Sequence, residues 1–109
     1  MGFLPLQLKT YGHTLIVPRR HASTLWEMTD VELAALMRVV RELSIRWRRT
    51  IAATGFNILH ASGTDAQQSI AHFHLHLLPR FTGDGLDAWP KISSLEADRV
   101  AMAERLRST

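Results

Sequence analysis

The sequence predicts an α+β domain, in which helices pack against an antiparallel sheet. The first observation behind this prediction is a set of short apolar runs that glycine, proline and polar residues separate. The second is a pair of segments with helical periodicity that lie apart from each other in the chain. The chain has 109 residues, 46% of them apolar, and it shows no internal repeat or linker, so we expect one domain over 1–109. Its expected elements are strands over 13–17, 55–60 and 69–78, one long central helix over 30–52 and a C-terminal helix over 94–107.

The clearest strand is the run His13-Thr14-Leu15-Ile16-Val17, where apolar and β-branched residues follow Gly12 and end at Pro18. Upstream, residues 3–8 are apolar enough for the end of another strand, which would enter a turn near residues 9–12. The strands expected over 55–60 and 69–78 are joined by a connecting loop.

The long helix begins at a capping box, in which the Thr29 hydroxyl accepts from the third backbone N–H and Glu32 reaches back. Met28 and Leu33 stand at the positions of a hydrophobic staple. A second capping box, Ser93-Ser94-Leu95-Glu96, predicts the start of the C-terminal helix. On the long helix, apolar residues recur mostly at spacings of three and four, which predicts one buried stripe: Leu33, Leu36, Met37, Val40, Leu43, Trp47 and Ile51.

The composition excludes several classes of protein. Cysteine is absent, which rules out disulfides, thiol catalysis and cysteine-based zinc sites and fits a cytoplasmic protein. We expect neither a membrane span nor a secretory signal, because no apolar run reaches about 18 residues and the start lacks a basic segment before a long apolar one. The formal charge of +3 modestly favours anionic partners. Five arginines on the long helix show neither interleaved exposed aromatics nor a groove-reading motif, so we interpret them as a solvated face and expect no nucleic-acid partner: Arg38, Arg41, Arg46, Arg48 and Arg49.

Three histidines, His72, His74 and His76, alternate with apolar residues in the strand expected over 69–78. Side chains alternate between the two faces of a strand, so all three imidazoles should share one face, about 7 Å apart. A neutral imidazole nitrogen is a nucleophile toward phosphorus, and a protonated one stabilises developing charge or protonates a leaving group. With an ordinary pKa of about 6.5, both forms are accessible at neutral pH.

A metal site is the alternative interpretation of this pattern, since histidines two positions apart can chelate zinc or copper. No cysteine or carboxylate lies in the segment, so further ligands would have to come from elsewhere in the chain. On this pattern, together with the family resemblance described next, we favour phosphorus chemistry and expect no metal and no cofactor.

The run from Gln68 to Arg80, QSIAHFHLHLLPR, resembles the signature of the histidine-triad (HIT) family in its Pro-Arg form. The run from Gly12 to His21 resembles the upstream strand of that family, and Gly55-Phe56-Asn57 resembles its penultimate strand. Gly83-Asp84 fits the branch that includes fragile-histidine-triad hydrolases. The resemblance extends over residues 3–90 or so. Typical members of the family carry further strands and a helix before the point that Phe3 matches, and this sequence has no counterpart to them.

The resemblance implies a role for each matching residue. His74 would form a covalent nucleotidyl-histidine, His76 would lie close to the leaving group, His72 would support the row, and His13 matches a fourth histidine that lines the site. The residues expected to contact substrate are Ser69 and Gln68 near the phosphate and Phe3 and Leu6, which keep apolar character where the family packs a base. Of the remaining histidines, we expect His21 to be structural and His60 to be a surface or loop-end residue.

Two positions depart from the family pattern. An amide usually stands eleven residues before the first triad histidine to hold phosphate, and here that position is Ala61. Asp or Asn often stands eight residues before His13 for the ribose hydroxyls, and here that position is Pro5. Ser62 and His60 are the nearest polar replacements for the missing amide.

By this resemblance, we expect a two-step reaction in which His74 attacks the α-phosphorus of a nucleotide conjugate and water then releases the monophosphate. Phosphoramidates and dinucleoside polyphosphates are the candidate substrates. The resemblance also implies a homodimer, for which the helix over 30–52 is a candidate contact. The alternative is a catalytically weak nucleotide-binding or interaction module that retains the triad but has lost turnover.

Overall fold

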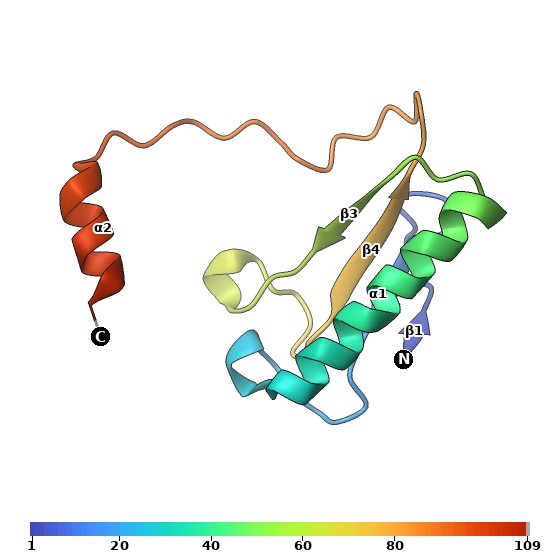
Figure 1. Cartoon of the computed structure of the whole chain (residues 1–109), viewed down its shortest axis with the longest axis horizontal. Helices are drawn as coiled ribbons and strands as arrows, with labels where there is room; N and C mark the ends of the chain where they lie inside the picture. Colours follow the sequence, from blue (N-terminus) through green and yellow to red (C-terminus); the bar gives the residue numbers. More distant parts are fainter. Residues whose placement is uncertain (109) are drawn as a thin grey trace.

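A four-stranded antiparallel sheet forms the centre of the computed structural model, which describes residues 1–108. The strand order is β1-β2-β4-β3, and the long helix α1 runs along one face of the sheet (Figure 1). This arrangement confirms the expected α+β class with an antiparallel sheet, one long helix and a C-terminal helix. The elements are β1 (Gly2–Phe3), β2 (Thr14–Ile16), the 3₁₀ helix η1 (Leu25–Glu27), α1 (Asp30–Thr50), β3 (Gly55–Leu59), the 3₁₀ helix η2 (Thr64–Ala66), β4 (Leu75–Arg80) and α2 (Arg99–Arg107).

The core lies between the sheet and α1. Strand β4 supplies Leu75 and Leu77 to it, β2 supplies Ile16, and α1 supplies Leu36 and Val40. Because side chains alternate along a strand, the residue between the two β4 leucines points to the face away from α1. That residue is His76, so burial of the leucines directs its imidazole to the open face of the sheet.

Helix α1 begins as expected and ends two residues earlier than expected. Both hydrogen bonds of the capping box form: Glu32 N–H donates to Thr29 Oγ1 (3.2 Å), and Thr29 N–H donates to Glu32 Oε1 (3.0 Å). The helix stops at Thr50 because Ala52 adopts a left-handed conformation, with φ +57°. Met37, expected in the buried stripe, is 47% exposed, and Val39 packs against the core instead.

The strand expected over 69–78 is displaced toward the C-terminus and begins at Leu75. Residues before it bond to the loop that follows β2 and not to a neighbouring strand. Phe73 N–H donates to the carbonyl of Ala22 at 2.6 Å, and the side-chain amide of Gln68 donates to the carbonyl of Ser23, also at 2.6 Å. The expectation that all three triad histidines lie on a strand was therefore wrong: only His76 does.

The C-terminal helix also differs from the expectation, since it begins at Arg99 and not at residue 94. Asp98 caps it by accepting from the backbone N–H groups of Val100 and Ala101, both at 3.1 Å. The capping box expected between Ser93 and Glu96 lies in an extended segment. This segment carries α2 away from the sheet (Figure 1).

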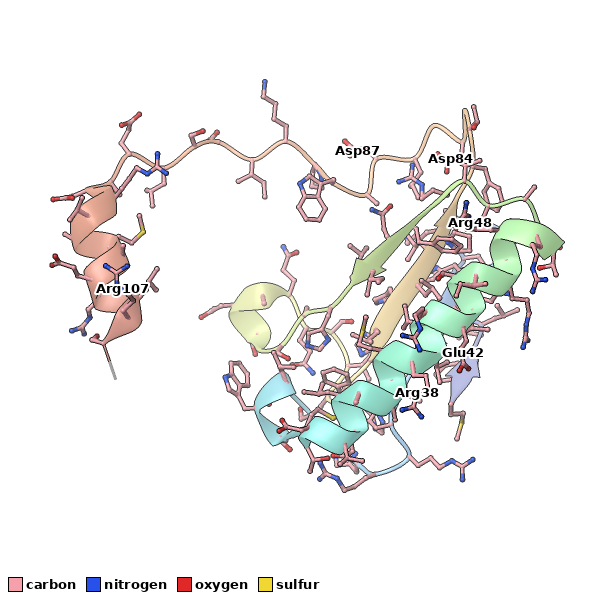
Figure 2. All side chains as sticks on the ribbon, in the orientation of Figure 1. Arg38, Glu42, Arg48, Asp84, Asp87 and Arg107 are labelled. Atoms are coloured by element: carbon pink, nitrogen blue, oxygen red, sulfur yellow. The ribbon has the colours of Figure 1, made fainter. Side chains whose placement is uncertain are left out.

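Neither α1 nor α2 is long and apolar enough to span a bilayer, within the part of the chain that the structure describes. All five arginines of the basic cluster on α1 are exposed, as expected for a solvated helix face; Figure 2 labels Arg38 and Arg48.

Candidate active site

His13 and His76 form a hydrogen-bonded pair on the open face of the sheet. His13 is buried directly before β2, and His76 lies in β4 opposite Leu15 of β2. The turn that delivers His13 depends on Gly12, whose φ of +87° favours glycine. A Cβ at Gly12 would stand 3.1 Å from Cγ of Pro79 in β4, so the turn also packs closely against the sheet.

The hydrogen bonds of this pair fix its tautomers. Lys9 N–H donates to Nδ1 of His13 (3.1 Å), so the ring proton of neutral His13 resides on Nε2. His13 Nε2 lies 2.9 Å from Nδ1 of His76 and donates to it. The ring proton of His76 therefore resides on its own Nε2, which is left as a donor for a substrate oxygen or nitrogen.

Both rings are held neutral. Burial lowers the pKa of His76 to about 4, with the neighbouring rings of His74, His13 and His60 acting in the same direction. Burial also lowers the pKa of His13, and Lys9 adds to this effect. His76 is therefore uncharged at neutral pH, and its Nε2–H is available to donate a hydrogen bond.

His74 presents the opposite nitrogen arrangement. Its Nδ1 lies 2.8 Å from the carbonyl oxygen of His72, and a carbonyl can only accept, so Nδ1 carries the ring proton. Nε2 of the neutral ring then holds the lone pair that a nucleophile needs. The ring is 9% exposed and stands edge-on to His76, with centroids 5.0 Å apart.

His72 lies to the side of this group. Its Nε2 donates to the carbonyl of Pro18 at 3.3 Å, and its ring contacts His21 at a centroid distance of 5.3 Å. Within the row expected from the sequence, His74 and His76 are in contact, and His13 joins them in a cluster through its hydrogen bond to His76. The alternation of faces nevertheless continues before β4, because Phe73, Leu75 and Leu77 enter the core while His72 and His74 line a hollow on the other face.

A small apolar hollow of about 220 Å³ adjoins His74. Phe3, which the resemblance implies would contact a base, is among its lining residues. Leu6, expected beside Phe3, is fully exposed at 105% and is not among the lining residues. The hollow is lined by Phe3, Leu15, Val17, Ile70, His72 and His74.

Of the two residues expected at the phosphate, Ser69 is exposed, while Gln68 is occupied by the backbone. Gln68 Oε1 accepts from Gly63 N–H (2.8 Å), and its Nε2 donates to the carbonyls of Ser23 and Ile70. Its side chain therefore holds the loop before the triad in place.

Arg80, the last residue of β4, has its guanidinium fully engaged within the protein. Its guanidinium pairs with both carboxylate oxygens of Asp84 (2.8 Å each) and donates to Asn57 Oδ1 and the carbonyl of Leu86. Asp84 lies in the segment that follows β4 (Figure 2). This contact lowers the pKa of Asp84 and fastens the segment to the sheet.

His60, interpreted from the sequence as a surface or loop-end residue, is joined to the cluster. It lies directly after β3, donates from Nδ1 to the carbonyl of His74 (2.9 Å) and stacks on Phe73 with centroids 4.4 Å apart. No motif marks it in the sequence, because the contact depends on pairing β3 with β4. Within residues 1–108, no three histidine, aspartate or glutamate side chains form a group that could hold a metal ion.

A HIT domain family model matches residues 3–83. Protein hit of Bacillus subtilis is 32% identical over 117 residues, covering 100% of this chain and 81% of that protein. An adenosine 5′-monophosphoramidase of Schizosaccharomyces pombe is 26% identical over 110 residues, covering 99% of this chain and 80% of that protein. The crystal structure of a zinc-bound histidine triad family protein from Mycobacterium smegmatis matches with a TM-score of 0.74 at 31% identity, covering 97% of this chain and 73% of that one.

Proposed function

The chain belongs to the histidine-triad (HIT) family, and from this premise we propose that it is a nucleotide hydrolase or nucleotidyl transferase with His74 as its nucleophile. The observation that carries the proposal is the hydrogen bond from His74 Nδ1 to the carbonyl of His72. This bond leaves Nε2 as the reactive nitrogen beside the donor nitrogen of His76.

In the proposed reaction, Nε2 of His74 attacks the α-phosphorus of a nucleotide conjugate. The bond from phosphorus to the leaving nitrogen or oxygen breaks, and the leaving group takes the electron pair and a proton from water. Nε2–H of His76 donates to the phosphoryl group or to the leaving atom, which offsets negative charge there without a change in its own protonation. Water then attacks phosphorus, breaks the phosphorus–nitrogen bond and releases the nucleoside monophosphate.

The hollow beside His74 is the proposed binding site of the nucleobase. Its lining apart from the imidazoles is apolar, contributed by Phe3, Leu15, Val17 and Ile70. Such a lining binds a flat aromatic group by burial and offers few hydrogen bonds that could select one base over another. We therefore propose phosphoramidates and dinucleoside polyphosphates as substrates, with weak base preference. The phosphoramidase named above supports the first class.

The rival proposal is a binding or interaction module with little turnover. It is favoured by Ala61, which provides no amide for phosphate, and by the Gln68 side chain, which the backbone occupies. Ser62 is no substitute, because its hydroxyl accepts from Leu25 N–H and bonds to His60.

Turnover of a fluorogenic adenosine phosphoramidate by wild type and His74→Ala separates these two proposals. We expect kcat to fall by several orders of magnitude in His74→Ala, because the covalent route is lost. Arg38→Ala is the matched control, since Arg38 is exposed on α1, across the sheet from the site. A His74→Ala enzyme that kept more than about a tenth of wild-type turnover, worth only about 1.4 kcal/mol of barrier, would contradict the nucleophilic role.

We propose that the covalent step needs no metal, although the Mycobacterium smegmatis relative was crystallised with zinc. Four imidazole nitrogens here are already engaged: His72 Nε2 and His74 Nδ1 with protein carbonyls, and His13 Nε2 and His76 Nδ1 with each other. The purified protein should therefore contain little metal, and chelators should not affect turnover of a phosphoramidate. Stoichiometric zinc by elemental analysis, lost on replacement of His72 or His76, would contradict this expectation.

We also propose that the protein forms a homodimer. Analytical ultracentrifugation tests this proposal, since a dimer has twice the mass of one chain.

A further inference from the structure

His60 stands where the ladder between β3 and β4 ends. The last registered pair is Leu59 with His76, and continued pairing would place His74 opposite Ala61. The ladder stops before that pair, and the carbonyl of His74 is instead bonded by the imidazole of His60 (2.9 Å). A side chain thus supplies the hydrogen bond at the point where the nucleophilic residue joins the sheet.

The donor role of His60 is set by Ser62. Leu25 N–H donates to Ser62 Oγ at 2.8 Å, so the hydroxyl hydrogen of Ser62 is free to point to Nε2 of His60, within hydrogen-bond distance. Nε2 then accepts, the ring proton resides on Nδ1, and Nδ1 donates to the carbonyl of His74. The hydrogen bonds thus run in one direction, from the N–H of Leu25 in η1 through Ser62 and His60 to the main-chain carbonyl of His74.

We propose that His60 is a positioning residue for the attack by His74, and that Ser62 orients it; this inference rests on the proposed function. His74 is held at two points, its ring by the carbonyl of His72 and its main chain by His60. Together these bonds fix where Nε2 points relative to the hollow and to His76. Neither His60 nor Ser62 touches the reacting atoms.

The expected signature is a loss in the chemical step and not in binding. A nucleophile displaced by about 1 Å can cost about a hundredfold in rate. We expect His60→Phe, which keeps a flat ring on Phe73 but has no donor, to lower kcat about 10- to 100-fold with KM within about twofold. Its thermal midpoint should stay close to wild type, because His60 is an exposed residue.

His60→Asn is the rescue variant, because the side-chain amide nitrogen of Asn takes the place of Nδ1 and can donate to the carbonyl of His74. We expect its kcat to lie within about threefold of wild type. Ser62→Ala should fall between the two variants, since it removes the group that selects the tautomer but leaves the donor. Equal loss in His60→Phe and His60→Asn, unchanged kcat in His60→Phe, or a change in KM alone would each overturn the proposal.

The ring nitrogen spectra of ¹⁵N-histidine-labelled protein give a readout that does not depend on turnover. We expect the signals of His74 to move in His60→Phe and to return in His60→Asn. If wild type has no turnover and forms no adduct, the proposed function fails, and these spectra alone decide the role of His60. His74 signals that are unchanged in His60→Phe would overturn the positioning role even in an active enzyme.

Discussion

Single hydrogen bonds decide which nitrogen of each imidazole faces the proposed substrate. The main-chain N–H of Lys9 sets which ring nitrogen of His13 carries the proton, and His13 in turn sets it for His76. The carbonyl of His72 sets it for His74. As a result, a lone pair at His74 and a donor at His76 stand side by side, with ring centroids 5.0 Å apart. This difference between two adjacent triad histidines follows from backbone geometry and has no counterpart in the spacing of the sequence motif.

The first prediction at this scale concerns Ala61. A hydrogen bond to a charged group is worth about 1.5–3 kcal/mol, so an amide restored by Ala61→Asn should tighten adenosine monophosphate binding about 10- to 100-fold. The gain should be equal for ribose and deoxyribose, since the contact is to phosphate, and wild type should discriminate little between the sugars because Pro5 has no polar side chain. Titration calorimetry of wild type and Ala61→Asn with adenosine monophosphate and with deoxyadenosine monophosphate measures these affinities. Tight wild-type binding with strong ribose preference would mean that other residues make these contacts.

The second concerns pH. The pKa of His76 is lowered from 6.5 to about 4 on folding. Between these values the unfolded chain binds the proton and the folded chain does not, so the free energy of unfolding falls as the pH drops from about 6.5 toward 4. From pH 7.5 to 5.0 we expect a loss of about 1 kcal/mol from this ring, because partial exposure reduces the full effect.

Urea unfolding of wild type and His76→Asn at these two pH values tests the assignment. The pKa of Glu32 is lowered to about 2, mainly by its hydrogen bond to Arg20. Its contribution to the free energy of unfolding is therefore lost only below the pH range of this comparison and does not affect the result. The variant should show the smaller loss. An equal loss in both proteins would show that His76 is not the titrating group.

Among the elements, the two expected capping boxes had different outcomes for a physical reason. Thr29 and Glu32 precede a helix whose apolar stripe packs on the sheet, so the cap and the burial stabilise the same start. Ser93 and Glu96 lie in a segment of exposed residues, and α2 begins only at Arg99, after Asp98 has capped two backbone N–H groups. The Thr29 box thus coincides with burial, whereas α2 has no buried residue and only the Asp98 cap marks its start.

The prediction for the secondary-structure elements concerns Gly12, in the turn before β2. Gly12→Ala should cost about 1–3 kcal/mol of stability, because φ is +87° and the new Cβ would meet Pro79 and Ile51 at 3.1 and 3.3 Å. Gly83→Ala is the matched control, with φ +73° and no atom within 4 Å, and should show only the backbone cost of about 1 kcal/mol. Thermal or urea unfolding gives both values. Equal effects would contradict close packing at Gly12.

For the molecule as a whole, the sequence predicted the α+β class, the antiparallel sheet, α1 and the three histidines. It predicted these because periodicity and capping depend on near neighbours in the chain. It did not predict that β4 begins at Leu75 or that His60 joins the cluster, because both depend on which strands pair and where a ladder ends. Leu6 was expected beside the base because it is apolar, but apolar character does not specify a direction, and the side chain is exposed.

The most direct test of the central claim is a search for a nucleotidyl group on His74. Wild-type protein is mixed briefly with an adenosine phosphoramidate, quenched in base, where phosphorus–nitrogen bonds to histidine survive, and analysed by intact-mass and peptide mass spectrometry. We expect a mass increase of one adenylyl group that maps to His74 and is absent from His74→Ala. Turnover without any adduct on His74, or an adduct that persists in His74→Ala, would contradict the account.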